Sequence, residues 1–295
     1  MGTIIRATGI STDPSVKSSI THAAIAAKSC LASAEVSAEQ IDLLINVGVY
    51  RDSNMVEPSM AALVQKEVGI NPDYVLHPAH KPTLSFDLMN GACGLLSAVQ
   101  VASSFLLTGK AEHVLIVSSD SHPSMEHVPG FPYAPLGAAM LLGRSPTERG
   151  FGPLRPRDGA DGYAGVEGFL DVTTMGTSGR GTLTLRTDPD YRARLLDLAV
   201  DAAKEYVDAA KLDLQRTLLV TSQPTPDFGA EIAHRLQMRA SSAVAVRGVE
   251  GDPHTSALTL AYHQAVKDGE VSKYDQILFI AAGAGLTTVC ASYRA

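Results

Sequence analysis

Cys93 is the residue of this chain whose sequence context best suits a nucleophile. It follows Gly91 and Ala92 in the segment "FDLMNGACGLLSAV" and precedes an apolar run that predicts a helix over 94–108. Unpaired amides and the macrodipole at a helix N-terminus favour the thiolate, which is the nucleophilic form of cysteine. The pattern therefore predicts a nucleophile with room beside its sulfur. A lone cysteine is also commonly a small buried hydrophobic residue, and that alternative stays open.

His254 occupies the equivalent place in the second half of the chain. After Cys93 the sequence reads as helix, turn and the strand "HVLIVSSD", and after His254 it reads as helix, turn and the strand "QILFIAAG". A duplicated α/β unit would bring the two helix N-termini together, with a thiol on one and an imidazole on the other. An imidazole can act as a base near neutral pH. The alternative is a residue that only caps or packs its helix.

The elements that must position these residues form an α/β pattern, in which short β-branched runs alternate with alanine-rich helical segments. We expect strands at 3–10, 41–49, 83–87, 113–120, 137–143, 216–223, 242–248, 276–283 and 286–293. We expect helices near 16–34, 57–68, 94–108, 190–210, 228–237 and 255–267. The segment "SPTERGFGPLRPRDGADGYAG" predicts a loop, which divides the chain into halves at 1–150 and 151–295.

The composition argues against several functional classes. The 295 residues carry a formal net charge of −7 without a basic run, which disfavours nucleic-acid binding. No segment approaches the roughly 20 apolar residues that span a bilayer, and no leader is evident, so we expect a cytoplasmic protein without membrane contact. Cys30, Cys93 and Cys290 are too scattered for a disulfide framework, and the histidines show no ligand spacing, so we assign no metal.

Several segments together resemble the thiolase superfamily and, within it, the ketoacyl-ACP synthase III (KAS III) group. The Cys93 segment through "VSSD" is similar to the family's nucleophile segment, "LGAAMLLG" to its "GAGAAVL" strand, and "GAGLTTVCASYR" to its terminal "GGGLTWGAALVR". The resemblance covers nearly the full length. It implies the thiolase fold, with two duplicated βαβαβαββ halves in alternating α-β-α-β-α layers, and makes Cys93 the acylated residue.

Two departures from the family pattern bear on the mechanism. The "HQAN" histidine of the family falls where this chain has Ser222 and Gln223, which either replace its hydrogen bond or are ordinary strand-end residues. Where KAS III has the asparagine of "GNTSA", this chain has His254 in "DPHTSA". The resemblance therefore implies a Cys93–His254 dyad.

The turn "AAGAGLT" resembles the family's "GFGGGLT" turn, whose backbone N–H works with that of the nucleophile to hold a thioester oxyanion. By this resemblance the oxyanion groups are the backbones of Cys93, Ala284 and Gly285. The same glycines would equally serve a tight link between two strands.

The resemblance implies an acyltransferase that takes an acyl group from an acyl-CoA or acyl-ACP thioester onto Cys93. The group then passes to an acceptor, by carbon condensation or by O- or N-acylation, in specialised polyketide or fatty acid metabolism. We expect no permanently bound cofactor, an acyl carrier protein as partner, and a homodimer or a heterodimer with a related ketosynthase through strand 83–87. The alternative is a catalytically weak partner subunit that scaffolds or gates an active ketosynthase.

Overall fold

The first half of the chain forms a five-stranded sheet. A computed structural model describes residues 2–71, 75, 82–123, 130–159, 165–171, 173, 183–283 and 285–295. The strand order in this sheet is β1 (Gly2–Ser11), β5 (Leu136–Ser145), β4 (Val114–Asp120), β2 (Leu43–Asn46) and β3 (Leu84–Asp87). Its helices are α1 (Ser19–Ala34), α2 (Met60–Val68) and α3 (Gly94–Leu107).

The second half forms a sheet in the order β10 (Thr217–Thr221), β11 (Gln276–Gly283), β12 (Thr287–Arg294) and β6 (Gly150–Phe151), with β7 (Arg155–Asp158) also paired to β12. Its helices are α4 (Tyr191–Ala210), α5 (Phe228–Arg235) and α6 (Ala257–Lys267). A separate hairpin pairs β8 (Val166–Leu170) with β9 (Leu183–Thr187).

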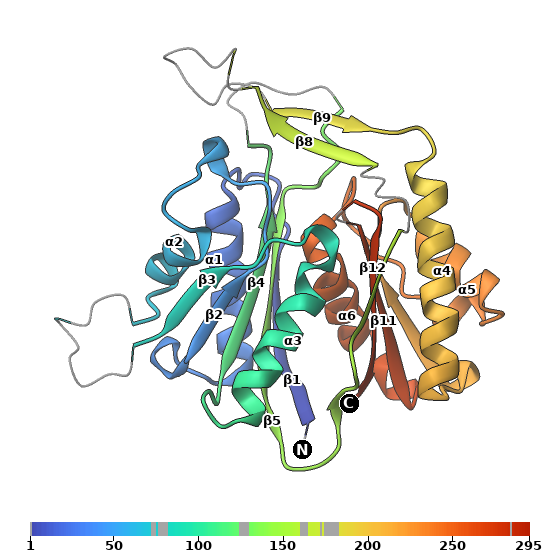
Figure 1. Ribbon diagram of the computed structural model, residues 1–295. Coiled ribbons are helices and arrows are strands. Elements are labelled where there is room, and N and C mark those ends of the chain that lie inside the picture. The colour runs from blue at the N-terminus through green and yellow to red at the C-terminus, as the bar shows by residue number, and fades with distance from the viewer. Residues whose placement is uncertain are drawn as a thin grey trace.

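The elements stack in alternating helical and sheet layers (Figure 1). Helices α1 and α2 cover the outer face of the first sheet, α3 and α6 lie between the sheets, and α4 and α5 cover the outer face of the second. Each helical layer has its own apolar core against a sheet, and the central core joins both sheets. The α-β-α-β-α thiolase architecture expected from the sequence is confirmed. Within the described residues, no helix combines the length and the apolar character needed to span a bilayer.

The two sheets follow the same path through the chain. The first half runs β1, α1, β2, α2, β3, α3, β4, β5. The second half repeats this order without a counterpart of β3, from β6 and β7 through α4, β10, α5, α6, β11 and β12. The predicted loop after residue 144 is wrong in part, because β6 and β7 lie within it and pair with β12. The edge of the second sheet thus begins inside the segment whose composition predicts a loop.

The predicted strand at 242–248 is also wrong. This segment makes one parallel bridge, Ala243 to Leu219, where the second half would need a counterpart of β3. Beyond that bridge, the side chain of Gln264 pairs with the backbone of Arg247: its Oε1 accepts from the N–H at 3.0 Å and its Nε2 donates to the carbonyl at 2.9 Å. A side-chain amide therefore replaces the neighbouring strand.

Candidate active site

Cys93 closes a single 3-10 turn, Gly91–Cys93, that leads directly into α3. Gly91 has a φ of 48°, a left-handed conformation that glycine adopts without steric cost. The turn fixes Cys93 with its side chain fully buried, and its Sγ lies 3.6 Å from the carbonyl oxygen of Thr287, to which it can donate. The backbone N–H of Cys93 donates to Asn90 at 2.9 Å, so in this state it is engaged within the turn.

The environment of Cys93 stabilises the neutral thiol. Burial raises the pKa of Cys93 to about 12, and the negative charge of Asp158 adds to this rise. Hydrogen bonds with the backbone of Val289 and Gly283 lower the pKa but do not outweigh burial, so the environment does not favour the thiolate that the sequence pattern predicts. A reaction at this sulfur therefore needs a base that removes its proton.

His254 and Asp120 form a buried carboxylate–imidazole pair beside this turn. Nδ1 of His254 lies 3.0 Å from Oδ2 of Asp120, which is fully buried at the end of β4. The 3-10 turn that begins at His254 contacts the turn that contains Cys93. No hydrogen bond joins Sγ of Cys93 to the imidazole, both of which the structure describes. The carboxylate leaves Nε2 as the imidazole nitrogen available to a reactant.

Asp120 is held by more than the imidazole. Its Oδ1 accepts from the backbone N–H groups of Val49 at 3.0 Å and Tyr50 at 2.8 Å. Its Oδ2 also accepts from the hydroxyl and the N–H of Thr255. Burial alone would raise the pKa of Asp120, but the charge and hydrogen bond of His254, with the bonds from Thr255 and Tyr50, lower it below its ordinary value. Asp120 is therefore an ionised and immobile partner for the ring.

The imidazole is correspondingly basic. Burial alone would lower the pKa of His254, but the charge and hydrogen bond of Asp120 and the charge of Asp252 raise it above its ordinary value. The ring packs against Tyr133, with centroids 4.1 Å apart, and lies 5.6 Å from the ring of Tyr50. These contacts fix the plane of the ring as well as its position.

A cavity of about 430 Å³ opens at this pair and at the Cys93 turn. Its described walls come from both halves of the chain and include Asn90, Gly91, Ala92, Tyr50, Tyr133, Val166, Tyr191, Asp252, His254 and Gly283. Cys93 itself is fully buried and is not among the residues that line this cavity. A substrate in this cavity therefore reaches the imidazole and the backbone of the turn before it reaches the sulfur.

The remaining residues predicted from the sequence lie apart from this cavity or on its rim. Ser222 is buried, and its Oγ accepts from the N–H of Ala282 at 2.9 Å. Nε2 of Gln223 lies 3.4 Å from the carbonyl of Val244, and Gln223 lines a neighbouring hollow. Gly285 lines the cavity, with its carbonyl accepting from Tyr191 at 3.0 Å. Ala284 lies outside the described residues.

Asp120 and Asp252 are two residues of the site that the sequence pattern did not predict. Asp120 is the only charged residue in the strand "VLIVSSD", and a carboxylate that ends a buried strand is a signal that could have found it. Asp252 precedes His254 by two residues in "DPH", a turn-forming pattern whose carboxylate accepts from the N–H of His254 at 2.7 Å. Either carboxylate could be recognised from the sequence only if His254 were already taken as a site residue.

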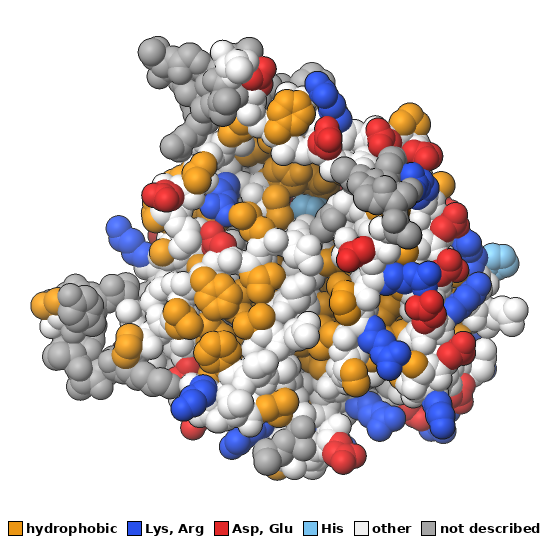
Figure 2. All heavy atoms as spheres, viewed as in Figure 1, with side chains coloured by type: hydrophobic (Ala, Val, Ile, Leu, Met, Phe, Trp, Pro, Cys, Tyr) orange, Lys and Arg blue, Asp and Glu red, His pale blue; other side chains and the backbone are white. Residues whose placement is uncertain are grey.

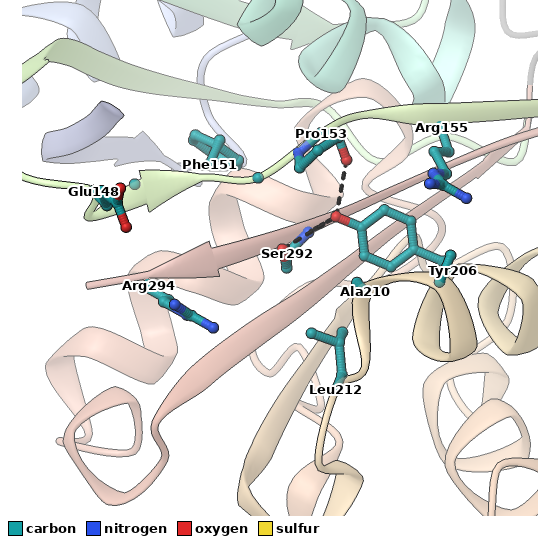
Figure 3. A pocket seen from close by; sticks show the side chains of 12 residues that line it. Glu148, Phe151, Pro153, Arg155, Tyr206, Ala210, Leu212, Ser292 and Arg294 are labelled. Carbon is teal, nitrogen blue, oxygen red and sulfur yellow. Dashed lines mark hydrogen bonds between the residues drawn. The ribbon is translucent and has the colours of Figure 1, made fainter. Parts of the chain in front are cut away.

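A second hollow, of about 290 Å³, lies along β6 and β12 beside α4 (Figure 3). The hydroxyl of Tyr206 donates to the carbonyl of Pro153 at 2.8 Å and accepts from the N–H of Ser292 at 2.8 Å (Figure 3). Neither Cys93 nor His254 lines it. Its inner polar groups satisfy one another, which indicates a structural junction and leaves the first cavity as the candidate site.

Comparisons with known proteins agree with the fold. No protein-family profile matches the chain. It is 28% identical over 274 residues to a beta-ketoacyl-[acyl-carrier-protein] synthase III of Thiobacillus denitrificans, covering 90% of this chain and 80% of that one. The solved 3-oxoacyl-(acyl carrier protein) synthase III of Pseudomonas aeruginosa superimposes with a TM-score of 0.85 at 17% identity, covering 100% of this chain and 98% of the other. The chain is KAS III-like and has the thiolase fold.

A priming β-ketosynthase from a polyketide biosynthetic pathway also superimposes on this KAS III-like chain. The TM-score is 0.79 at 18% identity, and the alignment covers 99% of this chain and 96% of that one. At these identities the two superpositions establish the shared architecture. The relatives named above are synthases, which are transferases that act on acyl groups.

Proposed function

We propose that this KAS III-like chain is an acyltransferase that forms an acyl-Cys93 intermediate from an acyl-CoA or acyl-ACP thioester. The observation that carries the proposal is the buried Asp120–His254 pair at the turn that presents Cys93. A nucleophile, a base beside it and a carboxylate that orients the base are the parts that acyl transfer through a cysteine requires.

The first step begins with the neutral imidazole, whose Nδ1–H donates to Asp120. The thiol turns from the carbonyl of Thr287 and gives its proton to Nε2 of His254. The sulfur attacks the thioester carbonyl, the bond to the departing thiol breaks, and His254 returns the proton to that leaving sulfur. Asp120 stabilises the imidazolium that exists between these events.

The second step transfers the acyl group to an oxygen or nitrogen nucleophile. His254 takes the proton of the acceptor, the acceptor attacks the acyl carbonyl carbon, and the proton passes to the sulfur of Cys93 as the C–S bond breaks. Carbon condensation would also need stabilisation of an enolate by a second side chain. By the family resemblance Ser222 falls where the family has its histidine, but it is buried and does not line the cavity. The placement of Ser222 thus favours a heteroatom acceptor.

The test is intact-protein mass measurement after incubation with acetyl-CoA, followed by peptide mapping. We expect one acyl adduct, on Cys93. Cys93→Ala should abolish it, and Cys290→Ala should not, although burial raises the pKa of both thiols to about 12. Adducts on Cys30 or Cys290 in the parent would contradict the assignment. Absence of any adduct with acyl-CoA and acyl-ACP donors would favour the partner-subunit alternative, which the burial of Cys93 supports.

We further propose that the chain pairs with a second copy or a related ketosynthase through β3. Among the described residues this strand is the last in its sheet, and Leu84 on it is 51% exposed. Apolar side chains gather near β3 and α3 on the face shown in Figure 2. A strand edge that has no neighbouring strand and is surrounded by apolar side chains can pair with a strand of another chain.

A further inference from the structure

The side-chain carboxylate of Asp252 forms part of the wall of the candidate active site. Its backbone is pinned to the segment around Tyr133, because Asp252 donates to Pro132 at 3.0 Å and accepts from Ala134 at 2.8 Å. Its Oδ1 accepts from the N–H of His254 at 2.7 Å. Among the described residues, Oδ2 has no hydrogen-bond partner. A fixed carboxylate therefore has one oxygen left for a ligand.

The cavity around this carboxylate suits a cation. Apart from tyrosines, the ionisable side chains among the described residues that line this cavity are Asp252 and His254. No lysine or arginine is among these lining residues. Tyr50, Tyr133 and Tyr191 supply three aromatic rings. Ammonium groups are attracted both by aromatic rings and by carboxylates.

Asp252 also lines two hollows that adjoin the cavity. These outer hollows share it with the inner cavity, and both are also lined by Pro132, Arg192 and Pro224. A molecule that enters from the outer hollows therefore passes this carboxylate on its way to His254. Asp252 is placed to select what approaches the acyl group.

We propose that the acceptor is a primary amine and that Asp252 binds its ammonium group before transfer. This inference rests on the proposed function and narrows it from oxygen and nitrogen acceptors to amines. The aliphatic or aromatic remainder of the acceptor lies against the tyrosine rings. Asp252 acts as the recognition residue, and His254 remains the base at the reacting atoms.

The proton balance is complete without another reactant. The bound ammonium gives one proton to the carboxylate of Asp252, and the neutral amine attacks the acyl carbonyl carbon on Cys93. The second proton passes from nitrogen to His254 and then to the departing sulfur, so that an amide and the free thiol result. Asp252 returns its proton to solvent.

The charges that face Asp252 are consistent with this role. Burial raises its pKa to about 6, an effect that His254 opposes, Asp120 reinforces and Arg192 weakens. The carboxylate is thus ionised at neutral pH, yet it is a stronger base than an exposed aspartate. The hydrogen bond from the N–H of His254 to Oδ1 of Asp252 stabilises the local turn and does not by itself indicate ligand binding. The test must therefore preserve this hydrogen bond while removing the negative charge.

Asp252→Asn does this, because the amide oxygen can still accept from His254. The matched control is Asp188→Asn, since Asp188 is exposed and lines one of the outer hollows but not the inner cavity. Calorimetry on the unacylated protein would compare choline with the uncharged alcohol in which carbon replaces its nitrogen. We expect the parent and Asp188→Asn to bind choline about tenfold more tightly than the isostere. Asp252→Asn should lose this preference.

Transfer provides the second measurement. Protein acylated with acetyl-CoA would be mixed with butylamine or with butanol, and the loss of the adduct followed by mass. Because the charge of Asp252 also acts on His254, deacylation is compared between the amine and the alcohol within each loaded variant, so that a change in loading does not enter. Asp252→Asn should slow amine-dependent deacylation about tenfold relative to alcohol-dependent deacylation. Equal binding of choline and its isostere by the parent, or an unaltered Asp252→Asn variant, would overturn the inference. Failure of the parent to acylate would instead contradict the proposed function, and the calorimetry would still decide the inference.

Discussion

The two turns that open α3 and α6 have the same shape but carry different chemistry. Each is a 3-10 turn of three residues that runs directly into its helix, Gly91–Cys93 in the first half and His254–Ser256 in the second. Each begins with a left-handed residue, at a φ of 48° for Gly91 and 46° for His254. The first half places glycine where this conformation has no steric cost, whereas the second places histidine there. A side chain in this conformation costs on the order of 1 kcal/mol and is common at functional sites.

This register corrects the equivalence expected from the sequence. His254 corresponds in the fold to Gly91, and Ser256 corresponds to Cys93. The hydroxyl of Ser256 is hydrogen-bonded to Ser118 at 2.8 Å, so the second half uses the cysteine position for structure. The duplication thus supplies two similar turns, and the groups that we propose to react occupy different positions in them.

The sharpest way to break this comparison is His254→Asn. Asparagine tolerates the left-handed conformation, so the turn should form, but no imidazole remains to take the proton of Cys93. Loss of a positioned base typically lowers rates by about 10² to 10⁴-fold. We expect the rate constant for acylation of Cys93, followed by mass, to fall by this amount with an unaltered circular dichroism spectrum.

His254→Gly is the matched control, because it restores the residue type that the first half uses. If the imidazole is what matters, both variants should be equally slow. Acylation of His254→Asn at the parent rate between about pH 6 and 9 would show that the base lies elsewhere.

Asp120→Asn should have a smaller effect and shift the pH dependence. The base form of His254 is neutral, so acylation should fall as pH drops through its pKa, which Asp120 holds above the ordinary value. Removing the negative charge lowers that pKa and moves the midpoint of the rate profile to lower pH. We expect the maximal rate to fall about tenfold to a hundredfold, because the ring loses its orienting charge.

Acylation rates measured across pH for the parent and Asp120→Asn would test this prediction. An Asn variant whose midpoint stays fixed while its rate falls would indicate that Asp120 supports the fold and does not tune the imidazole.

The sequence predicted the architecture better than the site. Periodicity located β11 and the helices to within a few residues, because buried strands and amphipathic helices each leave a regular apolar pattern. The motif indicated Cys93 and His254, which the structure places on contacting turns. Asp120 was missed because its contact with His254 spans 134 residues and no local pattern records it. Burial of Cys93 depends likewise on packing of both halves around one cavity.

The outer edges of the two sheets differ as the two turns do. In the first half β3 pairs with β2 over four residues and leaves its other edge without a strand among the described residues. In the second half the equivalent segment, 242–248, makes one β-bridge. The side chain of Gln264 makes hydrogen bonds with the backbone N–H and carbonyl of Arg247. The first edge is therefore the one suited to pairing with another chain.

The final prediction uses this difference between the edges. Leu84→Lys places a charge on the exposed apolar edge of β3, and a charge buried in an interface without a partner is unfavourable. We expect the dissociation constant of a dimer, measured by sedimentation, to rise about tenfold or more. Val266→Lys on α6 is the control, since Val266 is 48% exposed and Leu84 is 51% exposed. Because Val266 lies away from β3, its variant should dimerise like the parent. A monomeric parent at micromolar concentration, or equal weakening by both variants, would contradict pairing through β3.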